Sequence, residues 1–373
     1  MHEAKTICFF NSTNAWGGGE KWHLDTSALL KNKGFEVKMF ISENASWKNL
    51  VEEKKIPFER IKVGNLSFLN PFKVLKTKSL IKKNNAHTVI VNLPRDLKLV
   101  GIAAKLAGVK HIVYRRGSAI PIKNTFLNRY IFKNIVTSIL TNSEKTKETI
   151  NQNNSNLFPK DKIFVVYNGI DIDEFENREF SPVYEAKDNE IVIGNVGRLV
   201  EQKAQDKLLE LSSVLEKKKI KHKILIGGDG KLLNYLQAKA KELSVENNIV
   251  FTGFVKDVKS FMKSIDVFVL TSKWEGFGYV LVEAMACKKP VIAFDISSNP
   301  EIIKDNETGF LIPAFDIDIL SEKIIELSEN ESLKKEMGEN SYNRVVELFS
   351  IEKTINNLLS LDFISECKAK QDD

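Results

Sequence analysis

The chain has 373 residues, of which 43% are hydrophobic and 28% charged, a composition typical of a soluble globular protein. Its net charge of +6 favours anionic ligands or acidic membranes but does not by itself indicate nucleic-acid binding. Cys8, Cys287 and Cys367 form no C-x-x-C motif, so neither a disulfide framework nor a zinc site is indicated. The length is too great for one ordinary core and predicts two domains. Without a signal peptide or an apolar run of about eighteen residues, we expect a cytoplasmic protein with no membrane span.

The first half of the chain alternates short apolar runs with helical patterns. We expect strands at residues 6–11, 35–41, 58–63, 88–93, 111–115, 136–142 and 163–167, with a helix near 20–33. The polar stretch 171–189 contains Pro182 and few apolar residues, and we interpret it as the linker between domains.

The second half repeats this alternation. Strands are expected at 191–196, 223–226, 249–254, 267–270, 291–294 and 309–312, and helices at 207–218, 232–243, 319–327, 333–346 and 351–364. Two such series predict an α/β protein with two doubly wound parallel sheets. Ligands are then expected at the carboxyl ends of the strands, in the cleft between the domains.

The most informative stretch runs from 266 to 290 and reads as a buried strand, a turn and a helix. Glu275 lies in the turn, and Glu283 lies eight positions later in the helix. Helical side chains lean toward the helix N-terminus, so the Glu283 side chain should point toward the turn that contains Glu275. Gly276 and Gly278 let a ligand approach the backbone closely, so the turn and the helix N-terminus together suit a phosphate or sugar hydroxyls. The alternative is that both acids face water.

Cations and glycine turns follow other strands of the predicted sheets. Arg198 and Lys203 stand after the strand at 191–196, where they could neutralise a pyrophosphate, although loop cations are usually just solvated. The glycine turns at 17–19 and 227–230 could hold an anion or serve only the chain's geometry. Residues 252–255 could present backbone groups to a base.

Two Asp-x-Asp triplets, at 171–173 and 316–318, could hold a divalent ion. The first lies in the expected linker, and the second lies at an expected helix start, where aspartate caps helices. We therefore favour a structural role for both triplets and expect no metal site there.

Basic residues alternate with bulky apolar ones between 115 and 133. Such a segment either lies on anionic lipid or forms a plain surface helix packed on its sheet. The candidate acceptor or membrane residues here are Arg115, Arg116, Lys123 and Arg129, with Lys133 continuing the pattern.

Taken together, these stretches resemble the retaining GT-B glycosyltransferases of family 4, also called glycosyltransferase group 1. The resemblance covers nearly the whole chain. The matching motifs are GGGE at 17–20, YNGIDIDEF at 167–175, GRLVEQK at 197–203, GGDG at 227–230, TGF at 252–254, EGFGYVLVEAMA at 275–286, NPEII at 299–303 and ETGFLIP at 307–313. The resemblance implies two Rossmann-like domains and a C-terminal helix that crosses back to the first. It places an acceptor-binding domain at 1–170 with 350–373, and a donor-binding domain at 171–349.

The resemblance also implies roles for single residues. Arg198 and Lys203 would stabilise the departing diphosphate, and Glu275 would hold the donor sugar, which makes these three the expected catalytic residues. Glu283 would bind the ribose hydroxyls, and Val255 would meet the base through its backbone. The donor-binding residues that the resemblance implies are Gly18, Gly19, Gly228, Val255, Gly276, Phe277, Gly278 and Glu283.

The implied activity moves a sugar, with retention, from a UDP- or GDP-sugar to a lipid-linked or cell-surface glycan such as lipopolysaccharide. No metal cofactor and no nucleic acid are expected, and the enzyme would lie at the inner face of the cell membrane. The alternatives are a nucleotide-sugar 2-epimerase and a non-catalytic module that binds lipid or nucleic acid. Alanine at Glu275 or Lys203 is expected to abolish transfer with little change in melting temperature.

Some positions depart from the family pattern. Many relatives carry a histidine after the fifth strand, where this chain has Arg115 and Arg116, and an arginine there would suit an anionic acceptor. Ala204, Lys288 and the pair 297–298 replace common glycines, which costs free energy if φ is positive there.

Overall fold

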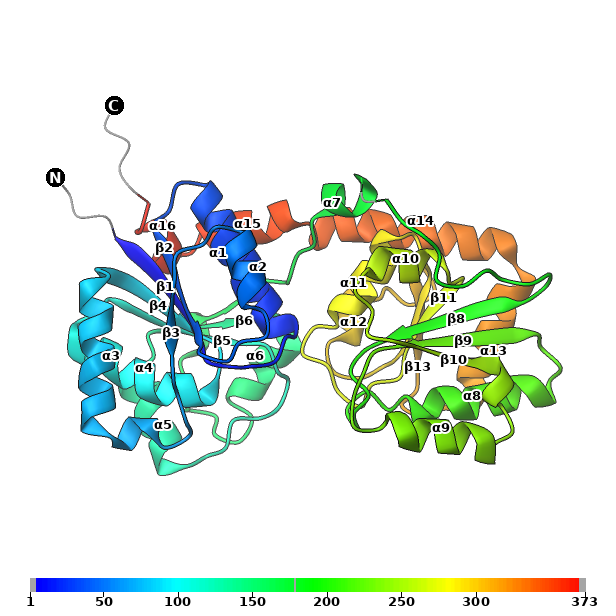
Figure 1. Ribbon diagram of the computed structural model, residues 1–373, viewed down its shortest axis with the longest axis horizontal. Coiled ribbons are helices and arrows are strands. Elements are labelled where there is room, and N and C mark those ends of the chain that lie inside the picture. The colour runs from blue at the N-terminus through cyan, green and yellow to red at the C-terminus, as the bar shows by residue number, and fades with distance from the viewer. Residues whose placement is uncertain (1–4, 178, 369–373) are drawn as a thin grey trace. The chain divides into compact units, whose positions relative to one another are not determined.

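The computed structural model describes residues 5–177 and 179–368 (Figure 1). The chain divides into two compact units, each described here by itself. Unit 1 takes Met1–Asn168 and Thr354–Asp373, and unit 2 takes Gly169–Lys353. The boundaries expected from the sequence, 1–170 with 350–373 and 171–349, lie within a few residues of these.

Unit 1 is built on a seven-stranded parallel sheet with the order β3-β2-β1-β4-β5-β6-β7. Its strands are β1 (Thr6–Asn11), β2 (Val37–Ser42), β3 (Phe58–Ile61), β4 (Ala86–Val91), β5 (His111–Arg116), β6 (Ser138–Thr141) and β7 (Ile163–Val165). Ile7, Phe9 and Phe10 of β1 are fully buried. A parallel strand covered by helices on both faces needs such a continuous apolar run, which is why the sequence revealed it.

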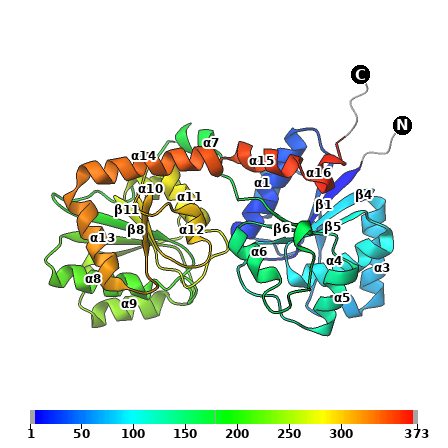
Figure 2. The same cartoon turned by 180° about the vertical axis from the view of Figure 1, so that it is seen from behind.

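Helices cover both faces of this sheet (Figures 1 and 2). One core packs residues of α3, α4 and α5 against the sheet, and the other packs residues of α1, α2 and the C-terminal helices against it. The helices are α1 (Gly18–Asn32), α2 (Lys48–Glu53), η1 (Ser67–Leu69), α3 (Pro71–Lys83), α4 (Pro94–Ala107), α5 (Phe126–Asn134), α6 (Glu144–Ile150), η2 (Lys160–Lys162), α15 (Ile351–Leu359) and α16 (Asp362–Ser365).

The chain breaks the helix that we expected at 351–364 into α15 and α16. Leu361 adopts an extended backbone conformation between them. This turn lets Leu358 on one side and Phe363 and Ile364 on the other enter the same core. Burial of apolar side chains on both sides of the turn outweighs the continuous helical pattern of the sequence.

Unit 2 is built on a six-stranded parallel sheet with the order β10-β9-β8-β11-β12-β13. Its strands are β8 (Ile191–Val196), β9 (His222–Gly227), β10 (Ile249–Gly253), β11 (Val267–Leu270), β12 (Val291–Phe294) and β13 (Gly309–Ile312). Its helices are α7 (Ile172–Asn177), α8 (Asp206–Lys217), α9 (Leu233–Glu242), η3 (Glu246–Asn248), α10 (Val258–Lys263), α11 (Tyr279–Ala286), α12 (Asn299–Ile302), α13 (Ile317–Glu329) and α14 (Glu331–Leu348). The prediction of two doubly wound α/β units is confirmed.

The linker prediction for 171–189 is wrong in its described part, because that stretch packs on unit 2. It begins with α7, and the backbone N–H groups of Ser181 and Val183 then donate to the hydroxyls of Ser260 and Ser264 at 3.0 and 2.8 Å. A polar composition hid these bonds, since they are made to distant side chains. None of the described helices has the length and apolar character needed to cross a bilayer.

Candidate active site

Three loops of unit 2 meet at the carboxyl edge of its sheet. Strands β9, β8 and β11 are adjacent and parallel, so the residues that follow them lie side by side. The loop after β8 carries Arg198 and Lys203, the loop after β9 carries Gly228, and the loop after β11 carries 275–278. The structure therefore brings together residues from three motifs that are far apart in the sequence.

Lys203 and Glu275 form an ion pair at this edge. The Lys203 Nζ lies 2.5 Å from Oε1 of Glu275, and the Ser272 hydroxyl donates to the same oxygen at 2.6 Å. Glu275 is 6% exposed, and the Lys203 side chain is 16% exposed. Removing one partner of a buried pair leaves an uncompensated charge. The burial therefore argues against the expectation that alanine at either position leaves the melting temperature nearly unchanged.

Further hydrogen bonds join the β8 loop to the β11 loop. The N–H of Lys273 donates to the Gln202 carbonyl at 2.7 Å, and the Gln202 side-chain amide donates to the Trp274 carbonyl at 2.9 Å. The Thr271 hydroxyl donates to the Lys203 carbonyl at 3.1 Å. These bonds fix both members of the ion pair relative to each other. Sequence reasoning missed Gln202 and Thr271, because their partners are about seventy positions away. It also missed Ser272, although the partner Glu275 is only three positions away.

Arg198 is available to a ligand, whereas Gly228 has a role in chain packing. Arg198 is exposed, and its carbonyl accepts a hydrogen bond from the Gln205 amide at 3.1 Å. Gly228 has φ of +132°, and a Cβ there would lie 2.0 Å from the Gly197 carbonyl oxygen. The close packing of the β8 and β9 loops therefore explains this glycine without a ligand. Val255 lies beside the end of β9, where a Cβ on Gly227 would meet it.

Helix α11 begins at the β11 loop. Gly278 has φ of +82° and precedes the first helical residue, so the turn needs a residue that tolerates the left-handed region. The Phe277 ring is buried against Tyr279 and Phe349, which leaves only its backbone for a ligand. Glu283 is partly exposed on a helix whose other described residues are mostly buried.

Five buried side-chain oxygen atoms lack a hydrogen-bond partner among the described residues of unit 2: Oδ1 of Asn195, Oε1 of Gln205, Oγ1 of Thr252, Oγ of Ser298 and Oδ1 of Asn299. Asn195 and Thr252 are the penultimate residues of β8 and β10, so two of these oxygens belong to strands that end at the edge described above. Buried polar atoms without partners cost free energy, and a ligand or water can satisfy them. A single Asn or Thr at a strand end has no sequence pattern that would have revealed it.

The carboxyl edge of the unit 1 sheet holds a second polar cluster. Gly19 packs so closely on Asn92 that a Cβ there would lie 2.5 Å from the Asn92 Nδ2. Glu20 is buried and accepts a hydrogen bond from Asn11 at 2.9 Å. Gly18 is the first residue of α1, and no side chain of the described residues caps that helix. Burial and the Arg115 charge hold the pKa of His23 well below its usual range, so its imidazole is neutral.

Arg115 is buried in this cluster, which contradicts the lipid contact expected of it. The residue is 3% exposed, and its guanidinium donates to the side-chain oxygens of Asn92 and Asn168 at 3.3 and 3.1 Å. It also lies 4.9 Å from the centre of the Trp22 ring. A guanidinium held on several sides by protein cannot lie on a membrane. The alternation of basic and apolar residues misled us, because Arg115 still belongs to β5.

The rest of the basic segment lies on the surface of unit 1. Arg116 is partly exposed and donates to the Tyr114 hydroxyl at 3.2 Å and to the Ile120 carbonyl. Lys123 and Arg129 are exposed, and Ile131 and Phe132 of α5 pack in the core. Both expectations thus describe part of α5, since one of its faces packs on the sheet and the other faces outward.

A similar surface on η1 and α3 was missed in the sequence. Leu66, Leu69, Phe72 and Leu75 are between 56% and 81% exposed, and Lys73 is exposed beside them. Val74 and Ile81 of α3 are buried, so this helix also has a packed face and an outward face. The exposed apolar residues lie on both sides of the break between η1 and α3. Because of this break they do not follow one continuous helical spacing in the sequence.

The Asp-x-Asp triplet at 316–318 has the structural role that we favoured. Asp316 caps α13, with its Oδ1 accepting a hydrogen bond from the Ile319 N–H at 3.0 Å. The triplet at 171–173 overlaps the start of α7.

Comparison with known proteins places this chain in a family. Residues 16–174 match the model described as Glycosyltransferase Family 4, and residues 176–344 match the model described as Glycosyl transferases group 1. An uncharacterized glycosyltransferase of Methanocaldococcus jannaschii, MJ1178, is 31% identical over 91% of this chain and 92% of its own length. The chain is a family 4, group 1 glycosyltransferase.

Other relatives of this glycosyltransferase have more specific names. The UDP-Gal:alpha-D-GlcNAc-diphosphoundecaprenol alpha-1,3-galactosyltransferase of Escherichia coli is 25% identical over 92% of this chain and 93% of its own length. The poly(ribitol-phosphate) alpha-N-acetylglucosaminyltransferase of Staphylococcus aureus is 31% identical, but the match covers 46% of this chain and only 35% of that protein.

Solved structures show which fold the glycosyltransferase has. The glycosyltransferase of Rickettsia africae matches with a TM-score of 0.85 and 21% identity, over 98% of this chain and 99% of that one. The complex of Anabaena Alr3699/HepE with UDP and glucose matches with a TM-score of 0.81 and 21% identity, over 96% and 100%. The expected GT-B fold with two Rossmann-like units is confirmed.

Proposed function

We propose that this glycosyltransferase moves a sugar, with retention of configuration, from a nucleoside-diphosphate sugar to a lipid-linked or cell-surface glycan. The observation that carries this proposal is the buried Lys203–Glu275 pair, which lies at the carboxyl edge of the unit 2 sheet with the exposed Arg198 on the same loop. Parallel α/β sheets bind ligands at this edge.

Cleavage of the bond between sugar and phosphate develops negative charge on the departing diphosphate. Arg198 and Lys203 stabilise that charge, and fixed cations do so most effectively when they need no rearrangement during the reaction. Glu275 holds the donor sugar together with the backbone of 276–278, and Glu283 accepts hydrogen bonds from the ribose hydroxyls. The two cations supply the positive charge, so the proposed transfer is independent of metal ions.

The donor in this proposal is a UDP-sugar, with a GDP-sugar as the alternative. The Anabaena structure contains UDP and glucose, and the Escherichia coli relative is named for UDP-Gal, which supports uridine. That relative is also named for an acceptor linked to diphosphoundecaprenol, which supports a lipid-linked acceptor. We assign acceptor binding to unit 1, where the partly exposed Arg116 suits an anionic group.

A lipid-linked acceptor requires the enzyme to reach a membrane surface. The outward faces of η1, α3 and α5 carry exposed apolar residues beside lysines and arginines, including Phe72, Phe126 and Tyr130. Apolar side chains insert at the boundary between headgroups and acyl chains, and basic side chains are attracted to anionic lipids. We therefore place the enzyme at the inner face of the cell membrane.

The first prediction tests the donor site with Arg198→Ala. The variant should lose roughly 10²- to 10³-fold in kcat, the usual effect of removing one group that stabilises the transition state. Its melting temperature should stay unchanged, because Arg198 is exposed. Transfer is measured with UDP-sugars and an undecaprenyl-diphosphate glycan acceptor, with and without EDTA.

Lys217→Ala is the matched control, because it removes an exposed lysine from the last turn of α8, at the other edge of the same sheet. It should transfer at the wild-type rate. Transfer by Arg198→Ala at that same rate would refute the assigned site, and loss of transfer in EDTA would refute metal independence.

A further inference from the structure

Two histidines and a glutamate converge at the amino edge of the unit 1 sheet. His87 is the second residue of β4, His111 is the first residue of β5, and Glu366 follows α16. Strands β4 and β5 are paired, and the two imidazole centres lie 5.3 Å apart. This edge is opposite to the one where α1 begins, so the cluster is separate from the polar cluster around Gly19 and Arg115.

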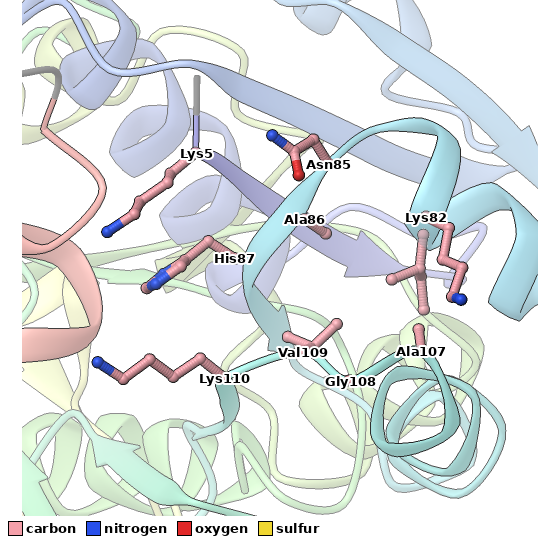
Figure 3. Close-up of a pocket in the computed structure, with 10 residues that line it drawn as sticks. Lys5, Lys82, Asn85, Ala86, His87, Ala107, Gly108, Val109 and Lys110 are labelled. Carbon is pink, nitrogen blue, oxygen red and sulfur yellow. The ribbon is translucent and has the colours of Figure 1, made fainter. Parts of the chain in front are cut away.

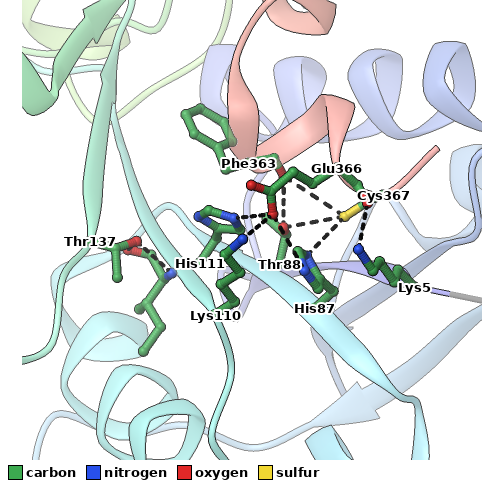
Figure 4. Close-up of polar contacts among 10 residues, drawn as sticks. Lys5, His87, Thr88, Lys110, His111, Thr137, Phe363, Glu366 and Cys367 are labelled. Atoms are coloured by element: carbon green, nitrogen blue, oxygen red, sulfur yellow. Dashed lines mark hydrogen bonds and ion pairs between the residues drawn. The ribbon is translucent and has the colours of Figure 1, made fainter.

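The three side chains aim ligand atoms at one point (Figure 4). Oε2 of Glu366 lies 3.0 Å from Nε2 of His111 and 3.6 Å from Nε2 of His87. One ligand atom from each residue lies within 4.8 Å of the other two. The histidine side chains are 13% and 14% exposed, and the glutamate side chain is 32% exposed. Two imidazole nitrogens and one carboxylate oxygen are a recurrent zinc ligand set, with a fourth position left for water.

A second contact orients His87. Its Nδ1 lies 3.4 Å from Sγ of Cys367, which in turn lies 3.4 Å from the Thr88 hydroxyl. Metal-binding histidines commonly donate from their other ring nitrogen to a carboxylate, a carbonyl or water, which fixes the ring and directs the free nitrogen at the metal, and here the Cys367 sulfur takes that place. Here the contact leaves Nε2 to face Glu366. Cys367 is buried, so the contact is shielded from water.

Lysines are the main obstacle to a cation at this point. Lys110 lies 2.6 Å from Oε2 of Glu366, and Lys5 donates to the Glu366 carbonyl at 3.1 Å. The Lys110 side chain is 58% exposed, so an arriving ion can displace it into solvent. His87 and Lys110 also line a hollow of about 460 Å³, which gives an ion a route to His87 (Figure 3). The nearby positive charges lower the affinity but do not block the ligands.

We propose that His87, His111 and Glu366 bind a divalent transition-metal ion, best matched by zinc, that fastens the segment after α16 to the unit 1 sheet. More than 250 positions separate Glu366 from the histidines, so the ion would tie the end of the described chain to strands from its first third. We assign this ion the task of fastening the chain and no part in the transfer, because it lies at the edge of unit 1 opposite to its polar cluster and is independent of the donor site in unit 2.

The test is calorimetric titration of full-length, EDTA-treated and desalted protein with zinc chloride at 25 °C. Wild type should bind one zinc ion per chain and melt at a higher temperature when saturated, because a ligand that binds the native state stabilises it. His111→Gln and Glu366→Gln should each lower the affinity at least tenfold and lose most of the thermal shift. Glu352→Gln, which removes an exposed carboxylate from α15, should behave as wild type.

Lys110→Ala separates a metal site from a plain network of hydrogen bonds. If zinc displaces Lys110, the variant should bind zinc severalfold more tightly than wild type. The proposal is overturned if wild type shows no saturable binding, if His111→Gln and Glu366→Gln bind as wild type does, or if Lys110→Ala binds zinc more weakly.

Discussion

Three residues of unit 2 occupy left-handed backbone conformations at positions where the family pattern has glycine. Ala204, Lys288 and Ser297 have φ values of 46°, 58° and 51°. The sequence could suggest this cost but not establish it, since φ depends on the turns that surround each residue. A residue with a Cβ loses about 1–2 kcal/mol in this region.

Ser297→Gly should raise the free energy of unfolding by about 0.5–1 kcal/mol. Relief of the left-handed strain outweighs the extra freedom that glycine gives the unfolded chain, and the side chain is only partly buried. Urea denaturation measures the change. Ser297→Ala keeps the Cβ and is the control, so an equal gain in both variants would show that strain is not the cause.

Asp96 is a fully buried acid near the start of α4. Its two carboxylate oxygens accept hydrogen bonds from the N–H and the hydroxyl of Ser12, at 2.9 and 2.5 Å. Burial raises the pKa of Asp96 to about 6 from an ordinary 3.8, and the hydrogen bonds from Ser12 only partly oppose this shift.

Stability should therefore depend on pH through Asp96. Because its pKa is higher in the folded state, the folded protein binds this proton more tightly, and the stabilisation is complete below about pH 4. It is lost as pH rises through 6, at a cost of about 3 kcal/mol. Asp96→Asn should flatten the profile between pH 4 and 7. The measurement is urea denaturation across this range, and parallel profiles for the two proteins would contradict the assignment.

At the scale of elements, η1, α3 and α5 each combine a packed face with an exposed apolar one. Helices α3 and α5 begin at the carboxyl edge of the unit 1 sheet, because they follow β3 and β5. Phe72 and Phe126 are 81% and 79% exposed, far more than the apolar residues of the packed faces. Isolated exposed apolar residues are ordinary, but a group beside basic residues is typical of a membrane-binding surface.

The double variant Leu69→Ser, Phe72→Ser should sediment less with vesicles that contain phosphatidylglycerol. Each substitution removes an apolar side chain that would be buried between lipids. Leu106→Ser is the control, because Leu106 is 54% exposed but lies at the C-terminal end of α4, at the opposite edge of the sheet. Equal sedimentation of wild type and the double variant would remove η1 and α3 from the proposed surface.

At the scale of the whole molecule, the sequence predicted the features that depend on residues close together in the chain. Strands β1, β8, β11, β12 and β13 have the bounds that we expected, because buried parallel strands are continuous apolar runs ended by turns. The sequence also placed Lys203 and Glu275 in one site, through motifs that each end a strand. It could not show that they pair, because 72 positions separate them and only the fold sets their distance.

The errors have the same origin. Arg115 reads as part of a basic surface segment, and only the course of β5 shows that its side chain enters a cluster with Asn92 and Asn168. His87, His111 and Glu366 show no metal motif, because their spacing in the sequence follows no short repeat. Contacts between residues distant in the sequence create the Arg115 cluster and the group of two histidines and a glutamate, whereas periodicity depends only on near neighbours in the sequence.

The division of the chain has a consequence for its biosynthesis. Unit 2 is one continuous stretch, whereas unit 1 is completed by 354–368, which supply Ile355, Leu358 and Phe363 to its core. When residue 353 has emerged from the ribosome, all of unit 2 has therefore been translated, but unit 1 still lacks its last segment. Nascent unit 1 keeps part of one apolar sheet face uncovered while unit 2 is being made, because α1 and α2 cover only the rest of that face. The half that is translated first is therefore the half that finishes folding last.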